Sequence, residues 1–207
     1  MQDGTNKTPR PRGRPRAYDP AVVAGRIVDT FWTCGYAATS LDQLAAATGM
    51  NRPSLYAAFG DKKSMYRGAL DAFATQVRRE VEAALAAPRI TVALREFYRG
   101  AIAVYLSGES GPRGCLFVCT AAVEAVNDAD IREDIGRVLQ GIDSALEARL
   151  KSAQQAGEIG STQRAGDLAR IAGAGLHSLA IRARTGTPKR QLERLAEALV
   201  QLITTAG

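Results

Sequence analysis

The sequence predicts an all-α fold of about nine helices. Two observations predict this fold class. Over most of the chain, apolar residues recur at every third or fourth position, which is the spacing of one face of a helix. Residues that cap helices precede many of these stretches, and Gly or Pro separates several of them from the next.

The first helix is expected over residues 19–34. Asp19 can cap it, and Pro20 suits its first position because the missing N–H has no partner there. Val23, Ile27 and Phe31 lie four residues apart and share one face. This face is expected to pack against the next two helices.

Residues 39–63 predict two short helices joined by a tight turn. Thr39 or Ser40 can cap the first helix, and Gly49 can end it in the left-handed backbone conformation. Asn51 can cap the second, and Pro53 is tolerated in its first turn. Two helices joined through a Gly-containing turn are the pattern of a helix-turn-helix DNA reader.

The second of these helices has one apolar and one polar side. Leu55 and Phe59 lie four residues apart and are expected to pack inward. Polar groups are left on the other side, and they can bond to phosphates or base edges. They belong to Arg52, Ser54 and Tyr56.

The remaining helices follow from the same spacing and from the breaks between stretches. A Gly- and Pro-rich loop is expected at residues 107–114. The helices are expected over residues 61–86, 91–107, 115–125, from Asp128 or Asp130 to about 157, from a cap at Ser161 or Thr162 to about 184, and from 188 to about 204.

The last two of these helices carry broader apolar faces than a surface helix needs. A second copy of the chain could cover the surplus and form a four-helix bundle, or the two helices could be buried within one protomer. The first interpretation predicts a homodimer interface of Leu168, Ile171, Gly175, Leu179, Leu192, Leu195 and Leu199.

Composition restricts the class of protein. No run of 18 apolar residues is present, and the basic N-terminus lacks the apolar segment of a signal peptide. Three cysteines, an odd number, favour reduced thiols. We therefore expect a cytoplasmic protein without membrane spans.

Positive charge is concentrated near the N-terminus. Residues 1–70 contain 10 Lys or Arg and 5 Asp or Glu, a net charge of +5 out of +6 for the chain. Residues 1–17 are expected to be a disordered basic arm. Its segment at 10–16, with Arg14 and Arg16, resembles the core of an AT-hook, which lies in the minor groove. A purely electrostatic arm is the alternative.

The order of motifs over residues 18–70 resembles the DNA-binding domain of TetR-type repressors. It comprises Gly35-Tyr36, Thr39-Ser40, Leu44-Ala45, Gly49, Ser54-Leu55-Tyr56, Phe59 and Asp61-Lys62. The resemblance implies that Lys62 meets a DNA phosphate. It also implies a DNA-binding domain at 18–64 and a helical ligand-binding and dimerisation domain at 65–207. Ala57 and Ala58 stand where the family often has an aromatic residue or histidine, so fewer contacts are expected there.

The resemblance further implies a mostly apolar effector cavity in the C-terminal domain. Candidate lining residues are the aromatic cluster and the single histidine. They are Phe73, Phe97, Tyr98, Tyr105, Phe117 and His177. Plain core packing is the alternative for each, and a dimer contact is a further alternative for the histidine.

Cys115 and Cys119 offer an alternative sensor. They lie four residues apart on an expected helix, and a thiol at a helix start can have a lowered pKa. The competing interpretation is two small core residues. No metal-ligand spacing, phosphate-binding loop or nucleophile elbow is present, so we expect neither a cofactor nor an enzyme.

These observations predict a DNA-binding transcriptional regulator. We expect a homodimer that binds a palindromic operator in double-stranded DNA and is released by a small, mostly apolar effector. A thiol-based redox or electrophile sensor and an architectural DNA-binding protein without a ligand are the alternatives.

Overall fold

The computed structural model describes residues 18–109 and 111–205, which form nine α-helices and one π-helical turn. The elements in order are α1 (Pro20–Cys34), α2 (Leu41–Thr48), α3 (Arg52–Phe59), α4 (Lys62–Leu85), α5 (Ile90–Tyr105), η1 (Phe117–Ala121), α6 (Ala122–Glu124), α7 (Ala129–Gln155), α8 (Ala165–Arg184) and α9 (Lys189–Thr205). The expected all-α fold is confirmed.

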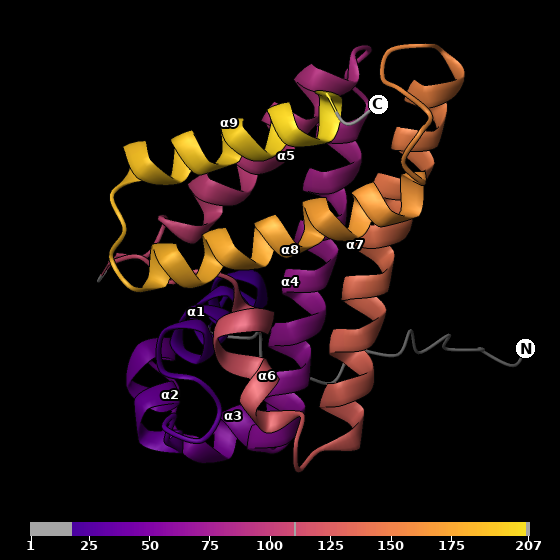
Figure 1. Cartoon of the computed structure of the whole chain (residues 1–207). Helices are drawn as coiled ribbons and strands as arrows, with labels where there is room; N and C mark the ends of the chain where they lie inside the picture. The colour runs from indigo at the N-terminus through magenta and orange to yellow at the C-terminus, as the bar shows by residue number, and fades with distance from the viewer. Residues whose placement is uncertain (1–17, 110, 206–207) are drawn as a thin grey trace, which may run out of the picture.

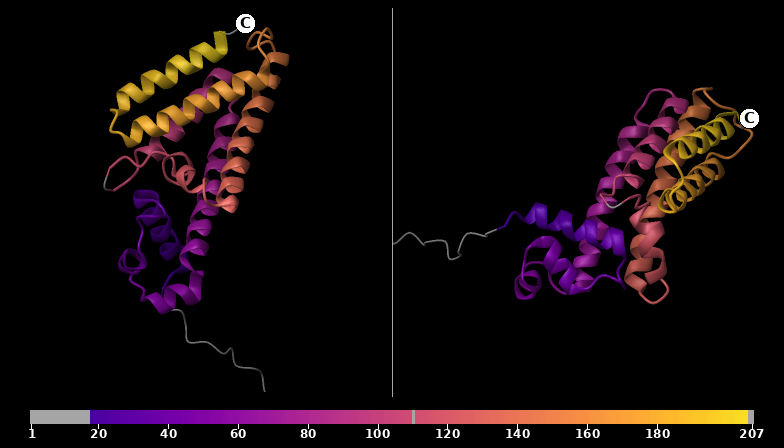
Figure 2. Two further views of the ribbon diagram at one scale, coloured as in Figure 1. Left: turned by 60° about the horizontal axis from the view of Figure 1, so that its bottom comes forward. Right: turned by 90° about the vertical axis from the view of Figure 1, so that its left-hand side faces the viewer.

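The helices form a small N-terminal group and a larger body (Figure 1). Helices α1 to α3 lie together at one end, and the long helices α4 and α7 run side by side from there into the body. Helices α5, α8 and α9 complete the body, with α9 packed on α5 and α8 (Figure 2). Helix α4 therefore connects the N-terminal group of helices to the body.

Two apolar cores meet along α4. The first contains the buried faces of α1 to α3 and the N-terminal half of α4 as far as Phe73. The second contains Val81 and Leu85 of α4 and the inner faces of α5, α7, α8 and α9. Leu116 and Phe117 of the body pack into the first core. Apolar packing thus crosses the expected division at residues 64 and 65, which stays a prediction.

The short segment at 115–125 was expected to be one α-helix, and this is wrong. It contains the π-helical turn η1 followed by the single turn of α6. The chain here packs against both cores at once. Phe117 and Ala121 join the first core, whereas Cys119 packs against the second. A π turn is typically a local insertion of this kind and leaves no periodic signal in the sequence.

The start of α8 also differs from the expected cap at Ser161 or Thr162. Helix α8 begins at Ala165. The preceding residues cross from α7 to α8, and the Gln154 side chain donates hydrogen bonds to the carbonyls of Gly160 and Gln163, at 3.0 and 2.7 Å. Across 18–109 and 111–205, none of the helices combines the length and apolarity that crossing a bilayer requires.

Candidate DNA-binding surface and effector cavity

Side-chain caps fix the geometry of α2 and α3. The Ser40 hydroxyl accepts a hydrogen bond from the Gln43 N–H at 3.1 Å, and the Gln43 side chain accepts one from the Ser40 N–H at 2.7 Å. Gly49 ends α2 with a φ of 69°, a conformation that costs a glycine little. The Asn51 side chain accepts a hydrogen bond from the Ser54 N–H at 2.9 Å. Contacts between residues close together in sequence therefore fix the geometry of the helix-turn-helix.

The polar side of α3 faces outward, as the sequence predicts. Leu55 is fully buried, and Tyr56 is 46% exposed. The expected DNA-binding residues that lie on the surface with Tyr56 are Ser40, Asn51, Arg52, Pro53 and Ser54. Thr39 does not belong to this surface. Its side chain is 1% exposed, and its hydroxyl donates to the Gly35 carbonyl at 2.6 Å, so it fixes the turn before α2.

The Asp42 carboxylate forms an ion pair with Arg52. The Nε and Nη2 atoms of Arg52 donate to the two Asp42 oxygens at 2.8 and 2.5 Å. The hydrogen bonds and charge of Asp42 raise the pKa of Arg52. Asp42 thus places the guanidinium beside the start of α3, although DNA must compete with this partner for it.

Lys62 lies at the start of α4 and joins this surface from the side. Its ammonium group is 4.5 Å from the centre of the Tyr36 ring, a cation–π distance. The Asp61 carboxylate caps α4 by accepting from the Ser64 N–H at 2.7 Å. Arg14 and Arg16, the expected minor-groove contacts, lie outside the described residues.

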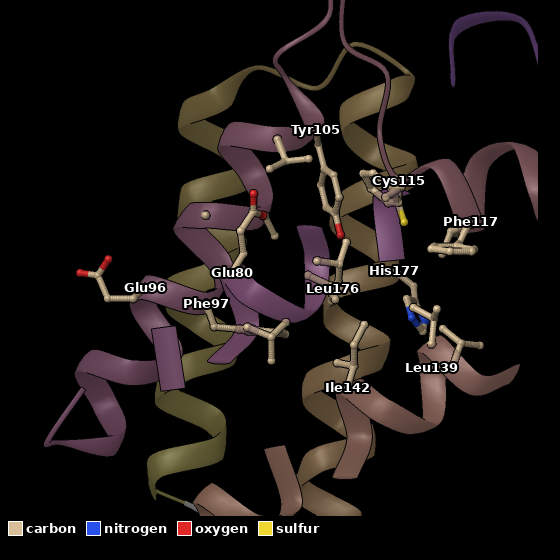
Figure 3. Close-up of a pocket in the computed structure, with 18 residues that line it drawn as sticks. Glu80, Glu96, Phe97, Tyr105, Cys115, Phe117, Leu139, Ile142, Leu176 and His177 are labelled. Atoms are coloured by element: carbon tan, nitrogen blue, oxygen red, sulfur yellow. The ribbon is translucent and has the colours of Figure 1, made fainter. Parts of the chain in front are cut away.

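A small apolar cavity lies in the body between α4, α5, η1, α7 and α8 (Figure 3). Its volume is about 60 Å³. The candidates that line it are Phe73, Phe97, Tyr105, Phe117 and His177. Tyr98 does not line it. Its ring is fully buried, and its hydroxyl donates to the Ala172 carbonyl at 3.1 Å, so it is a core residue between α5 and α8.

Polar groups also line the cavity, and the sequence did not point to the two glutamates among them, Glu80 and Glu96. Glu80 of α4 lies beside Tyr105 of α5. Burial raises the pKa of Tyr105, with smaller contributions from the two neighbouring thiols and Glu80. Burial lowers the pKa of His177, although Asp143 partly opposes this shift. At neutral pH the imidazole is therefore uncharged.

A wider groove adjoins the cavity between α4 and α7. Its volume is about 770 Å³, and it contains charged side chains, among them Arg67, Arg78 and Asp134. Five apolar residues line both the groove and the cavity, namely Val77, Val81, Phe117, Val138 and Ile142. The two spaces are therefore separated by apolar side chains of α4, η1 and α7.

Comparison with known proteins places this arrangement in a family. Residues 27–69 match the model of the family described as bacterial regulatory proteins, tetR family. The chain is 28% identical over 202 residues to the HTH-type transcriptional repressor ComR of Escherichia coli (strain K12), covering 97% of this chain and 96% of ComR. A cysteine mutant of the TetR family transcriptional regulator CifR, complexed with 26-base-pair operator DNA, superposes with a TM-score of 0.79. It is 29% identical, and the match covers 91% of this chain and 98% of CifR.

The chain is a TetR-family transcriptional regulator. A further relative, the uncharacterized HTH-type transcriptional regulator YezE of Bacillus subtilis (strain 168), is 25% identical over 148 residues, 71% of this chain and 76% of YezE. The matches to ComR and CifR extend far beyond the helix-turn-helix. The similarity to these two proteins therefore includes the helical body as well as the DNA-binding helices.

The two groups of helices in this TetR-family protein are joined by a buried polar contact. The Trp32 indole N–H of α1 donates to the Gly114 carbonyl at 3.1 Å. Arg184, the last residue of α8, donates to the carbonyls of Trp32 and Thr33 at 3.3 and 3.2 Å. The C-terminal end of α8 thus caps the C-terminal end of α1. Residues this far apart in sequence leave no periodic signal, so these contacts could not be predicted from the sequence.

The thiols do not form a reactive pair. Cys115 lies just before η1, and burial raises its pKa to about 11. Burial also raises the pKa of Cys119, although Arg184 partly opposes it. The expectation of a lowered pKa at a helix start is therefore wrong for Cys115, because the loss of solvent outweighs two hydrogen bonds from backbone N–H groups. The redox alternative is not favoured.

The expected dimer interface is partly wrong for the TetR-family body. Leu168, Gly175, Leu179 and Leu192 are buried within the protomer. A Cβ atom on Gly175 would lie 2.5 Å from a methyl of Leu199, so this glycine lets α9 approach α8. The large apolar side chains left exposed on these two helices are Ile171, Ile181 and Leu202, at 43%, 51% and 57%.

Proposed function

We propose that this protein is a ligand-responsive repressor that binds a palindromic operator as a homodimer and leaves it when a small, mostly apolar effector enters the cavity. One observation carries the proposal. Helix α4 bears Lys62 at its DNA-proximal end and cavity-lining residues, Val77 among them, along its middle. Any change in the cavity that tilts α4 therefore moves the DNA-binding surface.

The DNA-binding half of the proposal rests on the exposed polar side of α3. Arg52, Ser54 and Tyr56 lie within the first five residues of α3, the part of a reader helix that enters the major groove. Each good base contact is worth about 1–3 kcal/mol, so one reader alone gives modest affinity. Two α3 helices, one from each protomer of a dimer, bring the affinity for DNA into the range of specific regulators.

The effector half rests on the size of the cavity. About 60 Å³ is too little for even a small aromatic molecule, since an apolar cavity of about 150 Å³ holds benzene. A bound effector must therefore push α4 away from α5, α7 or α8. Because the effector binds only the widened state, it shifts the population away from the described arrangement. We propose that the described arrangement is the DNA-competent one.

The dimer in this proposal uses the exposed side of α8 and α9. Gly175 contacts Leu199, and the two helices run in opposite directions, so Ile171 lies near Leu202 one turn away. Ala174 and Ala198, which are exposed between them, allow close approach of a second copy. This surface replaces the four buried residues of the original expectation.

Operator selection tests the proposal directly. Full-length protein is incubated with random duplex DNA, and bound sequences are amplified and sequenced. We expect an inverted repeat, and binding to it is then measured by fluorescence anisotropy. Arg52→Ala should weaken this binding by about tenfold or more through lost base or phosphate contacts. Arg99→Ala is the matched control, because Arg99 is also an exposed arginine paired to a carboxylate, Glu96, but lies on α5.

Two results would contradict the proposal. Recovery of DNA without any common sequence would favour the alternative of an architectural DNA-binding protein. Equal affinity for a single half-site and for the full repeat would refute the paired readers. In either case the comparison of Arg52→Ala with Arg99→Ala still shows whether α3 contacts DNA.

A further inference from the structure

The charged groups that line the cavity are all acidic. Among its lining residues, Glu80 and Glu96 are the ionised side chains, and neither Lys nor Arg is present. Glu96 forms an ion pair with Arg99, and its carboxylate points away from the cavity (Figure 3). Glu80 is therefore the charge that an effector meets.

Glu80 has no cation partner among the described residues. Its one hydrogen bond comes from the Gln76 side chain one turn earlier on α4, at 2.9 Å. A carboxylate at the edge of an apolar cavity loses hydration when a ligand covers it, and an unpaired charge resists that loss. An effector that brings a positive charge to Glu80 compensates this cost, whereas a neutral or anionic one does not.

Tyr105 supplies a polar group that reaches the cavity. The residue is 5% exposed. The buried side-chain atoms without a partner among the described residues are the Tyr66 hydroxyl and Arg113 Nε, so the Tyr105 hydroxyl keeps contact with open space. The hydroxyl points into the cavity from α5, on the side where Glu80 lies (Figure 3). A tyrosine hydroxyl can both donate and accept hydrogen bonds. It is therefore available to a polar group on a molecule that enters the cavity.

Aromatic rings complete the surroundings. Phe97 of α5, Phe73 of α4 and Phe117 of η1 line the cavity with Tyr105. Ring faces attract cations, most strongly where water is excluded. The cavity thus combines one unpaired carboxylate, one tyrosine hydroxyl and several aromatic rings.

We infer that the effector is a compact lipophilic cation, an aryl- or alkylammonium compound whose charged group lies between the Glu80 carboxylate and the Tyr105 hydroxyl. This inference rests on the proposed function and names the chemical class of its effector. The apolar part of the molecule fills the space between α4, α5 and α8, and this widens the cavity.

Three probes of similar size but different charge test the inference. They are 2-phenylethylammonium, its uncharged carbon analogue propylbenzene, and the anion 3-phenylpropionate. Binding to the full-length protein is measured by calorimetry. Release of the selected operator is measured by anisotropy. We expect the cation to bind best and to release the operator.

Two conservative variants locate the charge. Glu80→Gln should weaken binding of the cation by about tenfold or more while leaving the uncharged analogue unaffected. Glu96→Gln is the matched control, since it removes a carboxylate that points away, and it should change neither. Tyr105→Phe should weaken binding of the cation several-fold by removing the hydroxyl.

Each contrary result overturns the inference. These results are no binding of the cation, equal or tighter binding of the uncharged analogue or the anion, and an equal loss in Glu80→Gln and Glu96→Gln. Operator binding in the absence of probe is measured separately. If it is intact, the regulator function stands although the effector class is wrong. If it is absent, the proposed function fails while the calorimetric result still decides the charge preference.

Discussion

Burial, more than sequence position, sets the chemistry of individual residues here. A pKa of about 11 leaves roughly one part in a thousand of the Cys115 thiol ionised at pH 8. Cys34 lies on the surface at the end of α1. We therefore expect iodoacetamide at pH 8 to alkylate Cys34 much faster than Cys115 in the native protein. Peptide mass spectrometry after timed quenching measures both rates in one sample. Faster reaction at Cys115 would revive the thiol-sensor alternative.

His177 makes stability depend on pH. Burial lowers its pKa, so the folded state resists protonation below about 6.5, where the unfolded chain takes up a proton. The histidine thus favours folding fully above pH 6.5, and this advantage is lost as the pH falls towards the folded pKa. Urea unfolding between pH 7.5 and 5 should show a flatter pH dependence for His177→Gln than for the wild type. Parallel profiles would show that Asp143 cancels the effect of burial.

Residue roles that depend on local geometry were predictable, and those that depend on distant contacts were not. Asp19, Ser40 and Asn51 cap helices as their spacing indicates. Tyr98 and Tyr105 lie on the same helix and look alike in sequence. Only the carbonyl of Ala172, on α8, distinguishes the core tyrosine from the cavity tyrosine.

At the scale of elements, the bend before η1 depends on a glycine that has two constraints. Gly114 has a φ of 65°, and a Cβ atom on it would lie 2.5 Å from the Ala180 carbonyl oxygen and 2.7 Å from the Cys119 sulfur. Gly157 has nearly the same φ, 68°, but open space around it. Comparing substitutions at Gly114 and Gly157 therefore distinguishes the cost of backbone strain from the cost of crowding.

We expect Gly157→Ala to lower the free energy of unfolding by about 1–2 kcal/mol, which is the cost of a left-handed conformation for an L-residue. Gly114→Ala should cost about 1–3 kcal/mol more, because the added methyl overpacks the contact between the loop and α8. Urea denaturation measures both variants. Equal losses would mean that the 107–116 segment shifts freely and does not hold α8 against α1.

Periodicity of apolar residues predicted some helices well and others poorly. Helices with a continuous apolar stripe, such as α1, α4 and α7, were predicted to within a residue or two. The segment at 115–125 was not, because its side chains face two cores and a single helical period cannot describe both. The late start of α8 escaped prediction because the Gln154 side chain, a distant partner, satisfies the carbonyls before it.

At the scale of the whole molecule, periodicity revealed surplus apolar surface on α8 and α9 but not which part of it a partner covers. Four of the seven residues of the expected interface are buried within the protomer, since each of these helices packs on several neighbours. An apolar stripe in the sequence marks burial of either kind. Only the fold separates burial within the protomer from burial between protomers.

Two exposed apolar residues, one inside and one outside the proposed interface, allow a matched test of the dimer. Ile171 on α8 and Val92 on α5 are apolar side chains of similar exposure, 43% and 39%, but only Ile171 belongs to the surface shared with Leu202. Ile171→Glu should raise the dimer dissociation constant by about 100-fold or more, because burying an unpaired carboxylate costs several kcal/mol. Sedimentation equilibrium measures this constant, and Val92→Glu should leave it unchanged. The Ile171 variant should also bind the full operator no more tightly than a half-site, since its two readers are no longer joined. If both variants dissociated equally, or if the wild type were monomeric at micromolar concentration, single chains would have to bind the operator. Helix α8 would then serve to close the effector cavity, and α9 would serve to cover α5 and α8.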